Sequence, residues 1–174
     1  MGEQAFVLAD TGQTGLALDL ISQALQIRVG VPKRLTAWLR GAQAEIHALA
    51  GNADACQRSL DQAATALPDD LLRDPDLPSI FLSHDHLNRW RGHSLALIGD
   101  GQAIAQLYDT LTTMDPTFAR ARAGLHCDLA QAHLIRGEHS EAADQLRSAR
   151  ALASWTGSIR YRRTIDGLTY RFPA

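Results

Sequence analysis

Four glycines divide the sequence at loose intervals, and a similar pattern of side chains follows each of them. The intervals between these glycines are 39, 48 and 38 residues. A small or medium-sized residue stands five positions after each glycine, a large one nine positions after it, and another small or medium-sized one twelve positions after it. The glycines are Gly12, Gly51, Gly99 and Gly137, and the following residues are Ala17, Ile21 and Ala24; Cys56, Leu60 and Ala63; Ile104, Tyr108 and Leu111; and Ala142, Leu146 and Ala149. A recurrence of this length indicates an array of stacked units.

The spacing within each unit predicts a helical hairpin. A glycine ends one helix in a left-handed or tight-turn conformation that other residues reach only at a cost. Positions five, nine and twelve residues later share one face of the next helix, because they are four and three residues apart. The small members let two helices approach closely, and the larger one fills the groove between them. Two of the units then end at a proline, Pro68 or Pro116, which stops the second helix.

The whole chain is therefore expected to be all-α. No segment shows the alternation of a strand. We predict a right-handed αα-solenoid over residues 1–174, behaving as a single repeat domain because each hairpin buries its face against its neighbours. The predicted helices are 2–10, 14–28, 33–49, 53–66, 79–97, 101–113, 117–136, 139–153 and 158–170. They pair into hairpins at about 1–28, 33–66, 79–113 and 117–153, followed by a capping helix at 158–170.

The two ends of this array differ in their expected surfaces. The first helix is short, so an apolar edge around Phe6, Val7 and Leu8 should be exposed. The last helix should place Ile159, Ile165 and Leu168 inward and its arginines outward, as a capping helix does. Between the second and third hairpins, residues 68–78 form an acidic, proline-bounded insertion that cannot be helical throughout.

The repeat frame resembles tetratricopeptide repeats in a degenerate form, with a looser period than their 34 residues. The stretches "HLNRWRGHSLALIGD", "ARARAGLHCDLAQAHLIRGEHSEA" and "TGSIRYRR" together resemble the C-terminal helical region of actinobacterial XRE-type (helix-turn-helix) transcriptional regulators. In that family an N-terminal DNA-binding domain precedes a tetratricopeptide-like region that senses an effector or binds a partner. Only about thirty residues precede Lys33, too few for the usual DNA-binding domain. The resemblance thus implies either the sensor part of a regulator or a stand-alone scaffold or dimerisation domain.

Composition excludes several classes of protein. No apolar run approaches the twenty residues of a membrane span, and no signal peptide is visible at the start. The two cysteines, Cys56 and Cys127, form no pairing pattern, so we expect a cytoplasmic protein. The net charge is −2, but residues 1–117 carry 8 basic and 14 acidic side chains whereas residues 118–174 carry 9 and 5. A basic terminal region is compatible with an acidic partner or with plain solubility.

A polar cluster, "SHDHLNRWRGHS" at residues 83–94, is the strongest candidate for a site. Arg89, Trp90 and His93 stand three, four and seven residues after His86, so the four side chains share one helix face. Nearby helices in the predicted array would add acidic and amide groups to this face. The candidate groove is Glu45, His86, Arg89, Trp90, His93, Asp128 and Gln131. An aromatic ring, an arginine fork and carboxylates suit a peptide or a small polar effector; the alternative is that Trp90 belongs to the core.

The same geometry argues against metal binding and catalysis. His86 and His93 are two turns apart, about 10 Å along the helix axis, too far for one zinc ion with bonds near 2 Å. The stretch "GHSLA", residues 92–96, lacks the second glycine of a nucleophile elbow and lies within a predicted helix. We therefore expect no catalytic residues, no metal, no cofactor and no enzymatic activity. The expected partner is a protein, peptide or small effector, with a homodimer as a further option and no direct contact with nucleic acid or membrane.

Overall fold

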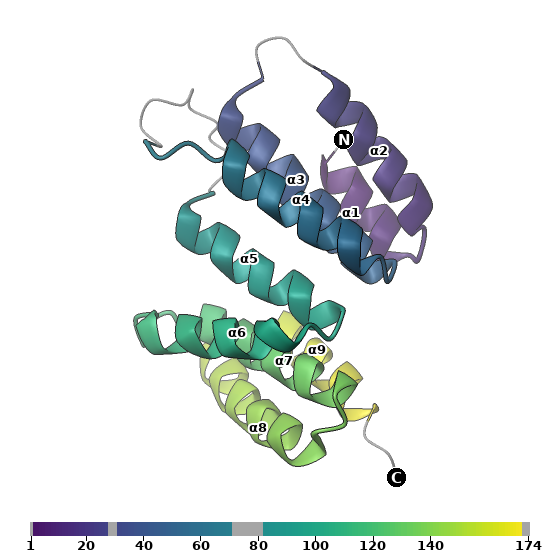
Figure 1. The fold of residues 1–174 in the computed structure, drawn as a ribbon. Helices are drawn as coiled ribbons and strands as arrows, with labels where there is room; N and C mark the ends of the chain where they lie inside the picture. Colours follow the sequence, from purple (N-terminus) through teal and green to yellow (C-terminus); the bar gives the residue numbers. More distant parts are fainter. Residues whose placement is uncertain (1, 28–30, 71–81, 172–174) are drawn as a thin grey trace. The chain divides into compact units, whose positions relative to one another are not determined.

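The computed structural model describes residues 2–27, 31–70 and 82–171, and within these residues all regular structure is helical, with no strand. The all-α prediction is therefore confirmed. The helices are α1 Gly2–Asp10, α2 Thr14–Gln26, α3 Lys33–Leu49, α4 Ala53–Ala66, α5 His84–Leu97, α6 Gly101–Thr113, α7 Ala119–Ile135, α8 His139–Thr156 and α9 Ile159–Thr169 (Figure 1). None of these helices is long and apolar enough to cross a membrane.

The predicted boundaries agree with these helices to within three residues wherever both ends are described. The largest difference of this kind is at the end of α8, which runs on to Thr156 rather than stopping at residue 153. The helix predicted from residue 79 is described from His84. Residues 71–81, which hold most of the acidic insertion at 68–78, lie outside the described residues.

Each predicted glycine ends a helix in the left-handed conformation, with φ between +69° and +80°. A fifth glycine, Gly157, does the same after α8 with φ +65°. At every one of these turns the glycine N–H donates to the carbonyl three residues back, and the next N–H donates to the carbonyl five residues back. This pair of bonds is the Schellman motif, which satisfies carbonyls that a helix end leaves unpaired. The turns occur at Gly12, Gly51, Gly99, Gly137 and Gly157.

The inward-facing frame is confirmed in three of the four hairpins and is wrong at two of its three positions in the other. After Gly12, Gly51 and Gly137, all of the residues predicted to face inward are buried. In α6 the predicted Leu111 is buried, but the other buried residues are Ala103 and Leu107 rather than Ile104, which is half-buried, and Tyr108, which is 40% exposed. The start of α6 explains the shift. Asp100 caps the helix by accepting from the Gln102 N–H at 2.8 Å, and the first turn closes through Ala103 N–H to Asp100 C=O, three residues back. This tighter turn advances the first part of α6 by about one residue relative to the other hairpins.

Contacts divide the chain into two compact units, Met1–Ser94 and Leu95–Ala174. In the first unit α1 packs on α2 and α3, α2 packs on α3, and α3 packs on α4. Its fully buried large side chains include Ile21, Ile46 and Leu60, each stabilising the fold by about 1.5–3 kcal/mol through burial. The predicted apolar edge is exposed only in part, because Val7 is 64% exposed whereas Phe6 and Leu8 are half-buried.

The second unit is built on α7, which contacts α6, α8 and α9, while α8 and α9 also contact each other. Ile165 and Leu168 of α9 are buried in its core, as predicted for a capping helix. Ile159 is 64% exposed, so its predicted inward position is wrong. The reason is the cap of α9. Ser158 accepts from the Tyr161 N–H and holds the first turn so that Tyr161, rather than Ile159, packs against the core of this unit.

The glycine turns give a direct stability prediction. Gly51→Ala should lower the free energy of unfolding by about 1–2 kcal/mol, because an alanine in the left-handed region pays that cost. A Cβ at Gly51 would meet no other atom within 4 Å, so the loss isolates the backbone conformation. Urea denaturation measures it.

Gly15→Ala is the matched control for this substitution. Gly15 is exposed inside α2, and a Cβ there also meets nothing within 4 Å. Because alanine is the better helix former by about 1 kcal/mol, the control should raise stability. Equal effects of the two substitutions would contradict the role given to the turns.

Candidate functional site

The Glu45 carboxylate of α3 receives two side chains of α5 in the first unit. The Trp90 indole N–H donates to Glu45 Oε2 at 2.5 Å, and His93 Nε2 lies 3.6 Å from Glu45 Oε1. The Glu45 side chain is 20% exposed and the His93 side chain 37% exposed. A half-buried carboxylate thus has one oxygen directed at each partner, which fixes its orientation without removing it from solvent.

Gly41 allows this arrangement, because it stands one helical turn before Glu45 on α3. A Cβ at Gly41 would lie 2.7 Å from Trp90 Cζ3 and 2.8 Å from Cε3, closer than real Cβ contacts. The missing side chain therefore makes room for the indole to lie directly against the α3 backbone. Gly41 lies within the helix predicted at 33–49, but nothing in the sequence pattern indicates why a glycine stands at this position.

Trp90 also belongs to an aromatic cluster with Phe6 and Trp38. The ring centroids are 6.0 Å apart for Phe6–Trp38 and Trp38–Trp90, and 6.3 Å apart for Phe6–Trp90. Trp90 is half-buried and packs against both core clusters described in the first unit. The residue therefore stabilises the fold through its ring and orients Glu45 through its N–H.

His86 and Arg89 lie on the same helix but do not join the Glu45 contacts. His86 is exposed, its backbone N–H donates to Ser83 Oγ at 3.3 Å, and its Nδ1 lies 2.8 Å from the same oxygen. Ser83 thus caps the start of α5 through its side-chain oxygen. Burial, followed by the nearby Arg89 guanidinium, lowers the pKa of His86, although Asp85 acts in the opposite direction. Arg89 is half-buried beside it.

The remaining two candidates, Asp128 and Gln131, lie on α7 in the second unit. Gln131 Oε1 accepts from the Arg171 guanidinium at 2.7 Å. Asp128 is half-buried and acts on its neighbour, because burial and then the Asp128 charge raise the pKa of the Cys127 thiol to about 12. Cys127 is thus held as an unreactive thiol.

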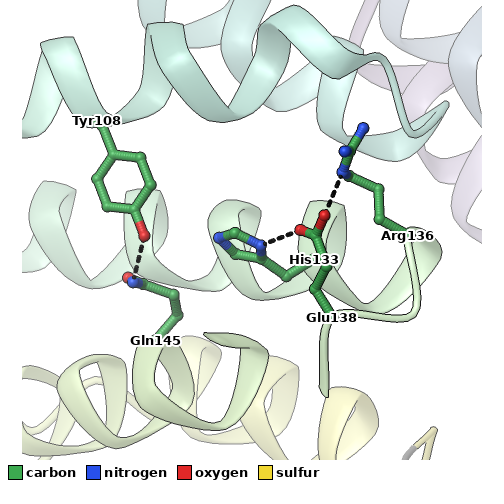
Figure 2. A network of polar contacts seen from close by, with 5 residues as sticks. All are labelled: Tyr108, His133, Arg136, Glu138 and Gln145. Atoms are coloured by element: carbon green, nitrogen blue, oxygen red, sulfur yellow. Dashed lines mark hydrogen bonds and ion pairs between the residues drawn. The ribbon is translucent and has the colours of Figure 1, made fainter. Parts of the chain in front are cut away.

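A second polar cluster, which the sequence did not predict as a site, lies in the second unit (Figure 2). His133 of α7 is buried, with only 7% of its side chain exposed, and its Nδ1 lies 2.7 Å from Glu138 Oε2. The other carboxylate oxygen, Oε1, accepts from Arg136 Nε at 2.8 Å. These bonds, His133 first and Arg136 second, lower the pKa of Glu138 below its ordinary value.

Further along α7 the cluster continues through α6 and α8. Gln145 Nε2 donates to the Tyr108 hydroxyl at 2.9 Å, and Gln145 Oε1 lies 2.7 Å from His126 Nδ1. The rings of Tyr108 and His133 meet edge to face with centroids 6.3 Å apart. Three helices of the second unit are therefore joined by side-chain bonds as well as by apolar packing.

The glycine turn provides the signal by which this cluster could have been found. In a Schellman motif the residue after the glycine returns to the residue five positions earlier, usually through an apolar contact. At Gly137 these two positions hold Glu138 and His133, and their backbone bond is 2.9 Å long. A histidine and an acid five residues apart across a helix-ending glycine therefore predict a hydrogen bond between their side chains.

Over residues 2–27, 31–70 and 82–171, no group of three or more His, Cys, Asp or Glu side chains is arranged to hold a metal ion. The described cysteines, Cys56 and Cys127, are both buried and not paired in a disulfide.

Comparison with known proteins adds no relative: no protein-family model, no curated protein and no solved structure matches the chain.

The close contact at Gly41 can be tested through its partner Trp90. Gly41→Ala should destabilise the protein, because overpacking costs about 1–3 kcal/mol whereas the better helix former returns about 1 kcal/mol. In a Trp90→Leu background the same change should be neutral or stabilising, since the clash is gone. Denaturant unfolding of the four proteins measures the coupling; an equal cost in both backgrounds would exclude the contact.

The Glu138 contacts predict an acid-dependent loss of stability. A carboxyl whose pKa is lowered on folding stabilises the protein above the ordinary value of 4.5 and loses that contribution as the pH falls below it. Glu138→Gln should therefore flatten the fall of the unfolding free energy below pH 4.5. Glu141→Gln, an exposed acid in the first turn of α8, is the matched control and should follow the wild type.

Proposed function

We propose that this chain is a non-catalytic binding module that receives a peptide or a small polar effector on the face of α5 that meets α3. The proposal rests mainly on one observation. Within the described residues, no hydrogen bond or ion pair holds the half-buried Arg89 guanidinium. It lies one turn before His93 and next to Trp90, beside side chains that are already fixed.

The neighbouring contacts make Arg89 suitable for binding. Trp90 is held by its ring packing and by its N–H bond to Glu45 at 2.5 Å, so the surface beside Arg89 is preorganised. An arginine fork recognises a carboxylate through two parallel bonds. An adjacent aromatic ring and a half-buried carboxylate offer an apolar contact and a hydrogen-bond acceptor. The chemistry of this face thus favours a ligand that bears a carboxylate next to an apolar group.

The same binding face continues along the predicted array of hairpins in this proposal. We propose that the hairpins stack as a right-handed, tetratricopeptide-like solenoid in which first helices line the binding surface. Glu45, Arg89 and His93 lie on such helices, as do Asp128 and Gln131 in the second unit. The five identical glycine turns support the repeat interpretation. A crystal structure of the whole chain tests the handedness of this array.

The resemblance to XRE-type regulators suggests the biological setting. In that setting the module is the sensor or partner-binding part of a transcriptional regulator whose DNA-binding domain is encoded upstream. Reading the genomic frame 5′ of the Met1 codon tests this: a helix-turn-helix domain in the same frame supports the regulator, and an intergenic stop supports a stand-alone module.

Arg89→Glu is the substitution that tests the binding face. Peptides selected from a random display library on the wild-type chain should lose at least about tenfold in affinity for this variant, as expected for reversal of a charge that pairs with the ligand. The melting temperature should stay near that of the wild type, because within the described residues Arg89 makes no hydrogen bond or ion pair. Fluorescence titration of the selected peptides gives the affinities.

Two further variants define the outcome. Arg58→Glu, an exposed reversal on α4, is the charge-matched control and should leave peptide affinity unchanged. Trp90→Ala is uninformative for binding, because its packing contacts predict a lower melting temperature. Peptides that bind wild type and Arg89→Glu equally would place the binding surface elsewhere.

A further inference from the structure

The outer face of the first hairpin combines acidic and aliphatic side chains. Residues 1–27 contain no lysine or arginine. On α1, Glu3, Val7 and Asp10 are exposed at spacings of four and three residues, so they share one helix face. On α2, Leu16 and Asp19 repeat the pattern at a spacing of three.

The apolar members of this face are exposed to an extent that a helix packed on both sides would not show. Val7 is 64% exposed and Leu16 56% exposed. The opposite side of the hairpin is occupied, since α3 packs on both α1 and α2. We call Glu3, Val7, Asp10, Leu16 and Asp19 the acidic face.

The last turn of α8 and the start of α9 carry the opposite combination. Trp155 is 75% exposed and Ile159 64% exposed, on either side of the turn at Gly157. Exposed arginines follow at once in α9, at Arg160, Arg162 and Arg163. We call Trp155, Ile159, Arg160, Arg162 and Arg163 the basic face.

The start of α7 extends the basic face. The Arg120 guanidinium donates to the Thr156 carbonyl at 3.3 Å, which places the beginning of α7 against the end of α8. Phe118, at the N-cap of α7, is 61% exposed. Exposed aromatic and aliphatic side chains beside several arginines are typical of an interface for an acidic surface.

We propose that the occupant of the basic face is the acidic face of a second copy of this chain. Each face supplies what the other lacks: carboxylates meet guanidinium groups, and Val7 and Leu16 meet Trp155 and Ile159. The contact is heterologous, because two different surfaces meet, so it propagates head to tail into a ring or a filament.

A nucleic acid would account for the arginines but not for the acidic face. A second copy accounts for both faces with one contact. None of these residues belongs to the candidate binding surface around Arg89, so failure of one proposal leaves the other standing.

Sedimentation of the whole chain tests the association. The weight-average mass should equal the 18.9 kDa monomer at low concentration and exceed it several-fold as the concentration rises from about 1 μM towards 1 mM. Raising the salt to about 1 M should return it towards the monomer, because exposed charges are then screened. A monomer at every concentration overturns the proposal.

Two double variants separate the faces. Arg162→Glu with Arg163→Glu changes the basic face, and Asp10→Arg with Asp19→Arg changes the acidic face. Each alone should raise the apparent Kd by at least about tenfold, with circular dichroism and melting near wild type because all four positions are exposed. Association that either double variant leaves unchanged overturns the proposal.

Mixing the two variants identifies the geometry. Head-to-tail contact predicts that an equimolar mixture associates again, since each variant retains the face that the other has lost. Asp54→Arg with Asp109→Arg carries the same charge change on exposed positions of α4 and α6 and is the control. Because it keeps both faces, the control alone should associate as the wild type does; loss of its association, or a mixture of the two face variants that stays monomeric, or binding of duplex DNA in place of self-association, overturns the proposal.

Discussion

The left-handed glycine after each first helix is the constraint on which the rest of this structure depends. A chain leaving an α-helix can reverse within two residues only if one residue takes positive φ, and glycine does so without a steric cost. The Schellman bonds then fix where the next helix starts. In three of the four hairpins the residues five, nine and twelve positions later are then all buried, and the small residues among them permit close packing.

The same turn also determines a polar contact. Its geometry brings the residue after the glycine back to the residue five positions earlier, whatever the two side chains are. At Gly12 these are Gln13 and Leu8, whereas at Gly137 they are Glu138 and His133, whose side chains are hydrogen-bonded. The same glycine turn therefore brings together different side chains at different places in the chain. At Gly137 it bonds the buried His133 to the turn that ends its own helix.

The features that the sequence predicted correctly are those that depend on residues close together in the chain. Helix boundaries and three inward-facing frames depend on spacing and on glycine, and both are visible in the chain itself. The frame of α6 was wrong at Ile104 and Tyr108 because the Asp100 cap, a detail of one side chain, shifts the first turn. Ile159 failed for a similar reason at Ser158.

Contacts between distant residues could not be read from spacing. The bond from Trp90 to Glu45 joins residues 45 positions apart, and the room for it is made by Gly41. Trp90 and Glu45 were predicted as members of one surface, but nothing in a periodic pattern indicates that one would hold the other. This contact changes how the surface should be interpreted: the indole is anchored in the core of the first unit, so its contribution to binding would come through rigidity. A side chain that is already bonded loses little conformational entropy when a ligand arrives. In the proposed binding module, the fixed Trp90 and Glu45 therefore define the shape of the surface, and the neighbouring Arg89 selects the ligand by its charge.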